Sequence, residues 1–279
     1  MKIPRYNNAI LRYNFLMKTK IIYEDESIIV CHKPAGFPVQ TKKLGQPDVE
    51  TELKNYLKGK TPGGGAPYLG IVHRLDQPVE GLMVVAKTAK VAAALSAAVD
   101  HNENKKEEKV PTGKMIKIYR ARIFGEPKKE AGYLEHFLKK EERTNLSVVV
   151  STRCDERVGL AGANENPAGK KTKNPAKKAR LYYAVTGPGE VLVRLYTGRH
   201  HQIRVQFAAE GTPLLGDTKY GTEASVARSR ELGMRNVALK AVYLAFSHPK
   251  SGKPLEFFLP GEEPFREKIE QLIRETETG

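Results

Sequence analysis

The stretch "IVHRLDQPVEGLMVVAKT", residues 71–88, places one carboxylate among basic side chains and beside an apolar run. Asp76 follows His73 and Arg74, and the run "GLMVVA" is typical of a buried strand. A structural ion pair and a catalytic carboxylate both fit this position. A loop next to a buried strand can hold a reactive group on a rigid scaffold, so Asp76 is a candidate catalytic residue.

A second polar cluster, "TGRHHQIR" at 197–204, contains two histidines and two arginines. No carboxylate or cysteine stands near the seven histidines at the spacing of metal ligands, so we expect no metal. The "GKT" at 59–61 lacks the glycine five residues earlier that a phosphate-binding loop requires. Neither G-x-S-x-G nor G-x-G-x-x-G occurs, which argues against α/β-hydrolase and dinucleotide-binding sites.

The charge balance is strongly basic. Forty-seven lysines and arginines against 32 acids give a net charge of +15 and a pI near 9.6. This excess favours a polyanionic partner, most often nucleic acid, although a solvated basic face gives the same count. Only two cysteines occur, Cys31 and Cys154, far apart in the chain, so we expect no disulfide or zinc site and a cytoplasmic location.

The elements that must position these residues begin in the N-terminal third. Residues 18–40 predict two strands joined by a turn and followed by a Pro-Gly loop. A short helix is expected at 49–57, a buried strand at 81–87 and an alanine-rich helix at 89–102. The expected core residues of the first two strands are Ile21, Ile22, Ile28, Ile29 and Val30.

From residue 115 onward the chain has the alternation of half-buried strands. Residues 201–211 fit a strand or a helix, and we favour a helix capped by Thr197 or a nearby residue and ended by Gly211. Residues 262–277 predict an amphipathic C-terminal helix.

The domain organisation expected from the sequence is simple. Residues 1–17 read as an N-terminal arm that could be disordered, and 18–279 as a single domain with a basic loop insertion at about 159–180. No apolar run approaches the roughly 20 residues of a membrane-spanning helix. The loop is rich in candidate RNA contacts, which are Lys170, Lys171, Lys173, Lys177 and Lys178.

Several motifs agree in identity and order with one known family. The "HRLD" at 73–76 is followed by Gly81, an apolar strand and "AKT". Further matches are "KPAGFPV" at 33–39, "KIYRARIFG" at 117–125, "TGRHHQIRVQ" at 197–206, "GTPLLGDTKYG" at 211–221 and "ALKAVYLAFSHPKSGKPLEFFLP" at 238–260. Across roughly residues 20–265 the chain resembles the RluA-type RNA pseudouridine synthases, and specifically the shorter members that lack an S4 domain.

The resemblance implies an α+β fold, with a mixed, largely antiparallel sheet, flanking helices and an active site in a central cleft. It implies an isomerase that detaches uracil from C1′ of a uridine in structured ribosomal or transfer RNA and rejoins it through C5. The target base must leave its stack to be reached. No cofactor is needed, and a monomer without membrane attachment is expected.

The resemblance also assigns roles to individual residues. Asp76 matches the essential carboxylate that acts at the ribose, either as a nucleophile or as the group that enables glycosidic cleavage. Arg204 matches its basic partner, and Tyr119 matches an aromatic residue that stacks on the loosened uracil and assists proton removal from C5. Arg74 matches a residue that fills the space of the flipped base. His73 and Arg199 are further candidate RNA contacts, with His73 expected to support the loop.

One departure from the family pattern follows the aspartate. Family members commonly have a basic residue and then a Thr-Ser pair before the glycine, whereas this chain has Gln77, Pro78, Val79 and Glu80. If close to Asp76, Glu80 would oppose its ionisation; alternatively, it points away and pairs with a lysine. Substrate choice and loop contacts therefore stay open.

Two alternative functions fit the same residues. The first is a catalytically idle RNA-binding or RNA-folding protein on the same fold, which shares the expected RNA binding. The second is a nucleoside or sugar hydrolase that releases free base, which needs a second catalytic carboxylate. Glu80 is the only near candidate for that second role.

Overall fold

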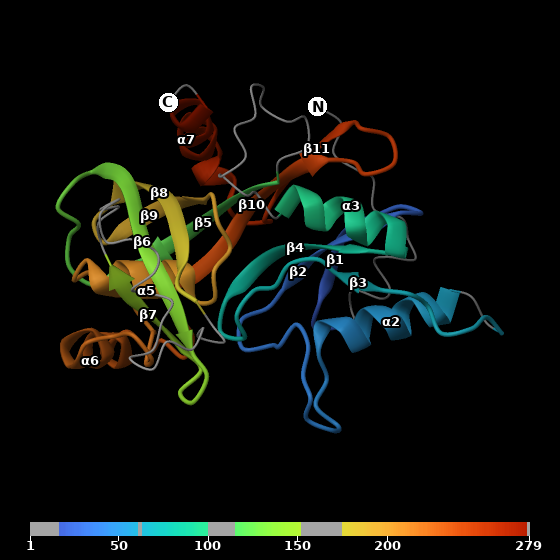
Figure 1. Ribbon diagram of the computed structural model, residues 1–279, viewed down its shortest axis with the longest axis horizontal. Coiled ribbons are helices and arrows are strands. Elements are labelled where there is room, and N and C mark those ends of the chain that lie inside the picture. The colour runs from blue at the N-terminus through green and yellow to red at the C-terminus, as the bar shows by residue number, and fades with distance from the viewer. Residues whose placement is uncertain (1–16, 61–62, 100–114, 152–174, 278–279) are drawn as a thin grey trace. The chain divides into compact units, whose positions relative to one another are not determined.

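The computed structural model describes residues 17–60, 63–99, 115–151 and 175–277. Its contacts divide the chain into two compact units, coloured mainly blue to teal and green to red in Figure 1. Unit 1 comprises Met1–Ile118 and Lys240–Glu267, and unit 2 comprises Tyr119–Leu239 and Lys268–Gly279. That the two units act as one catalytic domain stays a prediction. The expected arm, apart from Met17, lies outside the described residues.

Unit 1 is built on a mixed sheet. Its strands are β1 (Lys20–Glu24), β2 (Ile28–Lys33), β3 (Gly70–Ile71), β4 (Glu80–Ala86), β10 (Leu239–Ser247) and β11 (Pro254–Phe258). The order β1-β2-β4-β10 is extended by β11 on β10 and by β3 on β4. All these pairs are antiparallel except β4 with β10, which run parallel. The two predicted N-terminal strands are therefore confirmed.

Helices α2 (Val49–Lys60) and α3 (Ala89–Val99) complete unit 1 and confirm the two predicted helices. Asp48 caps α2, because its carboxylate accepts the backbone N–H of Thr51 at 2.7 Å. Four of the five expected core residues are fully buried, but Ile22 is only partly buried because alternate β1 side chains face opposite sides of the sheet. Cys31 is a free, buried thiol.

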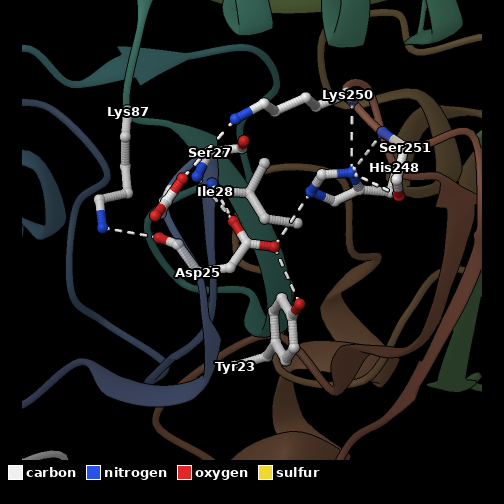
Figure 2. A network of polar contacts seen from close by, with 9 residues as sticks. Tyr23, Asp25, Ser27, Ile28, Lys87, His248, Lys250 and Ser251 are labelled. Atoms are coloured by element: carbon white, nitrogen blue, oxygen red, sulfur yellow. Dashed lines mark hydrogen bonds and ion pairs between the residues drawn. The ribbon is translucent and has the colours of Figure 1, made fainter.

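A polar network ties the β1–β2 turn to the β10–β11 turn within unit 1 (Figure 2). His248 contacts Asp25 through Nε2 at 3.0 Å and Ser251 Oγ through Nδ1 at 3.0 Å. This order of serine, histidine and aspartate resembles a hydrolase triad. However, Nδ1 also accepts the backbone N–H groups of Lys250 (3.3 Å) and Ser251 (3.0 Å), so its lone pair already caps the turn. The network is therefore structural.

Unit 2 is built on an antiparallel sheet. Its strands are β6 (Ala131–Glu141), β7 (Leu146–Ser151), β8 (Lys177–Gly187) and β9 (Glu190–Leu195), in the order β9-β8-β6-β7. Strand β5 (Ile116–Arg122) comes next to β9, ahead of it in that order, and enters unit 2 at Tyr119. Helix α5 (Gln202–Ala209) packs against β6 and β7, and its Val205 meets Leu138 of β6 and Ala179 of β8.

Two further helices belong wholly or mainly to unit 2. They are α6 (Glu223–Glu231), which the sequence analysis missed, and α7 (Arg266–Glu277), which confirms the predicted C-terminal helix after the short 3₁₀ turn Glu263–Phe265. Together, the described elements form the mixed α+β fold with a mainly antiparallel sheet that the sequence predicted. No helix in the described ranges combines the length and apolarity needed to cross a membrane.

The prediction for α5 was correct in its type, and of the two options for its cap, Thr197 or a nearby residue, Thr197 was wrong. The N-cap is His201, which has the left-handed φ of 53° and no capping side-chain bond. Thr197 instead donates its hydroxyl to Gln202 Oε1 at 2.8 Å. Gly211 follows the C-cap with φ +81°, a conformation that glycine adopts at low cost, and so ends the helix as predicted.

The predicted basic loop was wrong at its C-terminal end. Lys177 and Lys178 lie in β8, opposite Leu138 and Phe137 of β6. Pairing with a neighbouring strand outweighed the polar composition, which by itself suggested a loop. Three of its expected RNA contacts, Lys170, Lys171 and Lys173, lie outside the described residues.

Candidate active site

Asp76 lies in the turn between β3 and β4 of unit 1 and is partly buried. The backbone N–H of Val79 donates to the carbonyl oxygen of Asp76 at 3.0 Å, which closes the turn. Leu75 and Val79 are buried on either side of the aspartate. Apolar burial on both flanks therefore restricts the backbone that carries the carboxylate.

His73 fixes the beginning of this turn. Strand β3 ends after Ile71 pairs with Val85. Beyond this point the His73 ring, instead of the backbone, bonds to β4: its Nε2 accepts the N–H of Val84 at 3.1 Å. Burial and the nearby Lys117 ammonium lower the pKa of His73 to about 3, so the imidazole is neutral and its proton is on Nδ1. The expected supporting role of His73 fits this geometry.

Lys33 fixes the other end of the turn, and the sequence analysis did not single it out. Its buried ammonium donates to the carbonyl oxygens of Pro34 (2.9 Å), Phe37 (2.7 Å) and Gln77 (3.1 Å). Burial lowers the pKa of Lys33 to about 8, and the Asp76 and Glu80 carboxylates oppose that shift. The Pro-Gly loop and the residue after Asp76 are thus joined through one cation.

The amide of Gln77 adds a second link, because its Nε2 donates to the carbonyl of Gly36 at 3.1 Å. The turn around Asp76 is therefore held by three bonds: one from β4 to His73, one from Lys33 at the end of β2 to Gln77, and one from Gln77 to the loop after β2. A signal for Lys33 was present in the sequence, since strand alternation places it on the same face as Ile29 and Cys31.

Glu80 pairs with His32 and Lys240, which bears on the question raised by the departure at 77–80. One carboxylate oxygen lies 3.1 Å from His32 Nε2, and the other lies 3.7 Å from Lys240 Nζ. The hydrogen bond from His32, together with Lys240, lowers the pKa of Glu80, so it stays ionised within its own pairs. The expected pairing of Glu80 with a lysine is found.

In unit 2, Arg204 is buried in α5 and bound by a carboxylate that the sequence analysis missed. Its Nε and Nη2 donate to the two oxygens of Asp217 at 2.7 and 2.8 Å. Asp217 also accepts the backbone N–H groups of Lys219 (3.0 Å) and Tyr220 (3.3 Å). This two-point contact fixes the plane of the guanidinium.

The start of α5 is fixed by a further set of contacts. The Tyr220 hydroxyl lies 2.8 Å from His201 Nδ1 and accepts the N–H of Ser147 at 2.8 Å. The His200 and His201 rings stack at 3.7 Å. These contacts hold His201 in its left-handed conformation, which costs energy for a non-glycine residue. The conformation of His201 in turn sets where α5 begins and so the position of Arg204 one turn later.

The remaining predicted residues are distributed between the units. Tyr119 is buried on β5 in unit 2, and Arg74 is exposed in unit 1. Arg199 donates its Nε to the carbonyl of Lys178 at 2.9 Å, so these two candidate RNA contacts are brought together. Asp76 belongs to unit 1 and Arg204 to unit 2, and their joint action stays a proposal. Within the described ranges, no group of three or more histidine, cysteine or acidic residues could hold a metal.

The units thus form an α+β protein with a rigidly held loop aspartate and a buried, oriented arginine. The sequence model described as RNA pseudouridylate synthase matches residues 27–209, which include Asp76, Tyr119 and Arg204. The chain belongs to this family of RNA-modifying enzymes. The resemblance seen in the motifs, and the enzyme class that it implied, are confirmed.

Individual relatives agree with the family match. The ribosomal large subunit pseudouridine synthase D of Vibrio parahaemolyticus is 34% identical over 265 residues, covering 92% of this chain and 71% of that protein. The protein of the same name from Zymomonas mobilis is 33% identical, covering 85% and 68%. In fold, human RNA pseudouridylate synthase domain containing 4 is similar with a TM-score of 0.60 at 22% identity, covering 91% of this chain and 93% of that one.

Proposed function

We propose that this protein converts specific uridines of ribosomal RNA to pseudouridine, with Asp76 as the essential carboxylate. The observation that carries the ribosomal substrate is the similarity over 92% of the chain to an enzyme named for the ribosomal large subunit. Relatives from Vibrio cholerae and Zymomonas mobilis carry the same name. Ribosomal RNA is therefore favoured over the transfer RNA that the motifs left equally open.

The proposed chemistry starts at Asp76. Its carboxylate acts at C1′ of the uridine, either by attacking the sugar or by enabling cleavage of the glycosidic bond, and both routes release the uracil for rotation. Reattachment through C5 then requires loss of the C5 proton. The bonds made by His73 and Lys33 around Asp76 support this role, because a carboxylate that must meet one ribose atom needs a backbone held in place.

Tyr119 and Arg204 complete the proposed catalytic group. The tyrosine ring stacks on the loosened uracil, and its phenol assists removal of the C5 proton. The guanidinium stabilises the negative charge of the Asp76 carboxylate, a role supported by its own fixed orientation on Asp217. Arg74, which is exposed, fills the space that the flipped base leaves in the RNA.

The wider assignments follow from the substrate. We propose that the protein works as a monomer on structured RNA in the cytoplasm, where ribosomal RNA is modified. Arg199 and Lys178 would contact the RNA backbone, together with the lysines at 170, 171, 173 and 177.

The experiment that tests the proposal is a pseudouridine map of total RNA from cells with and without the gene. One or a few sites in large-subunit ribosomal RNA should disappear on deletion and return with the wild-type gene. The same rescue with Asp76→Asn should fail although the variant is present at normal amounts. An unchanged map in the deletion strain would instead support a catalytically idle RNA-binding protein.

A further inference from the structure

The outer face of the unit 2 sheet carries aromatic and basic side chains where a solvated sheet normally carries small or mixed polar ones. Alternation along β6 and β8 buries Leu134, His136 and Leu138 and turns their neighbours outward. We define the outer face by six of the outward side chains, which are Tyr133, Lys139, Lys178, Arg180, Tyr182 and Tyr196. The opposite face is covered by α5.

The aromatic rings on this face form one continuous group. Tyr133 pairs with Tyr182 across β6 and β8, and their rings meet edge to face at 5.0 Å. Tyr133 and Tyr196 lie 5.9 Å apart. The Arg180 guanidinium contacts two of these rings, with its carbon 4.3 Å from the centre of Tyr133 and 5.0 Å from that of Tyr196. The rings and the guanidinium are therefore already in mutual contact before any ligand arrives.

One side of this group is closed and the other is open. The end of α7 contacts the β9 side, where the Tyr196 hydroxyl donates to the carbonyl of Thr276 at 3.4 Å. On the β6 side the Tyr133 residue is 40% exposed, and the side chains of Arg180 and Lys178 are 31% and 39% exposed. Val150 of β7, next to β6, is 47% exposed. An exposed tyrosine and valine among cations mark a binding surface better than a solvated face.

The positive charge of the outer face indicates which kind of partner it binds. Three of these six side chains are cations. The neighbouring acid Glu135 pairs with Arg180 at 2.9 Å and with Lys178 at 3.7 Å, and a second acid, Glu275, accepts a hydrogen bond from the Tyr182 hydroxyl. A sheet that combines accessible rings with excess positive charge can stack unpaired bases and contact phosphates at once. A purely apolar partner would leave these cations desolvated without compensation.

We propose that the outer face of unit 2 binds an unpaired segment of the RNA substrate. Tyr133 stacks on a base, Arg180 holds the tyrosine ring in position, and Lys139 and Lys178 contact the backbone phosphates. This inference rests on the proposed action on RNA and adds a second contact surface, separate from the residues proposed for catalysis. Such a surface supplies affinity from unit 2 itself.

The test measures the affinity of the whole protein for a fluorescein-labelled, single-stranded oligouridylate of about 12 nucleotides by anisotropy. Tyr133→Ala should weaken binding about tenfold, because it removes one base-stacking ring. Tyr133→Phe keeps the ring and should bind like the wild type. Tyr68→Ala is the matched control, since Tyr68 is 47% exposed in unit 1, and it should leave the affinity unchanged.

A second variant covers the case in which Tyr133→Ala unfolds. Lys139→Gln changes one partly exposed side chain and should reduce the slope of log affinity against log salt by about 0.7, the value for one phosphate contact with a single strand. Unchanged affinity in a folded Tyr133→Ala overturns the proposal. If that variant is unfolded, an unchanged slope in Lys139→Gln overturns it.

These outcomes are independent of the proposed activity. Pseudouridine formation by the wild type is scored separately on ribosomal RNA. A wild type that makes pseudouridine while Tyr133→Ala binds normally removes the second surface and keeps the enzyme. A wild type that makes none while Tyr133→Ala loses affinity removes the proposed function and keeps the surface.

Discussion

His73 and Lys33 are polar side chains that hold backbone near Asp76 instead of facing solvent. Each satisfies main-chain groups that the turn leaves without a strand partner: His73 accepts from Val84, and Lys33 donates to three carbonyls. Both pKa values are lowered by burial. The electrostatic cost of the site therefore falls on His73 and Lys33, the two side chains that hold the backbone around Asp76.

This cost makes stability depend on pH through His73. Its pKa is about 3 in the folded protein and has the ordinary value of 6.5 in the unfolded chain. Between these pH values the unfolded chain therefore binds a proton that the folded chain excludes. Its stabilising contribution is therefore complete above pH 6.5 and is lost as the pH falls toward 3. From about pH 7 to about pH 5, wild type should lose roughly 2 kcal/mol more unfolding free energy than His73→Asn in urea titrations. Equal losses in both proteins would contradict the assignment.

At the scale of elements, β4 anchors the turn that carries Asp76, and α5 carries Arg204. Strand β4 enters the sheet through Gly81, which has φ +135° and would place a Cβ 2.4 Å from backbone atoms of Ala241. Helix α5 begins at a strained His201 and carries Arg204 on Asp217. Close packing at Gly81 and the buried ion pair of Arg204 with Asp217 leave little freedom for substitution at these positions.

Gly81→Ala should lower the free energy of unfolding by about 3 kcal/mol or more, because both the positive φ and the contact with Ala241 oppose a side chain. The control is Gly132→Ala in β6, where an added Cβ meets nothing within 4 Å. That variant should stay within about 0.5 kcal/mol of wild type. Equal effects of the two changes in chemical denaturation would refute the packing argument.

Asp217→Asn should cost about 3 kcal/mol, since it removes the buried charge that contacts the Arg204 guanidinium at two points. Glu231→Gln is the control, because it breaks an exposed pair with Arg228 of similar length, 2.9 Å, and should cost less than about 0.5 kcal/mol. Thermal unfolding of both variants gives the comparison. A destabilisation no larger for Asp217→Asn than for Glu231→Gln would mean that the two-point contact contributes little.

Some of these elements could be predicted from the sequence, and others could not. The strands at 20–33 were predictable because isoleucine-rich runs flank a polar turn, and α3 because alanine dominates it. Strand β8 begins at Lys177 inside a basic run, where pairing with β6 decides the structure and composition gives no sign of it. Asp217 stands 13 residues from Arg204 on no shared periodicity, so only the folded chain reveals the pair.

For the whole molecule, the net charge of +15 is the property that most directly concerns RNA. Binding that releases counterions weakens as salt rises, so affinity for ribosomal RNA should fall at least about tenfold between roughly 0.05 and 0.2 M salt. Filter binding across this range gives the slope, and unfolding curves at the same salt concentrations control for stability. An affinity independent of salt would place the basic residues outside the RNA interface.

The central claim is that the Asp76 carboxylate is essential for chemistry on RNA and not for binding it. The direct measurement is release of tritium from ribosomal RNA labelled at C5 of uridine, with purified wild type, Asp76→Asn and Glu80→Gln. We expect release by wild type and Glu80→Gln, none by Asp76→Asn, and similar RNA affinity for all three. Tritium release by Asp76→Asn at the wild-type rate would contradict the claim.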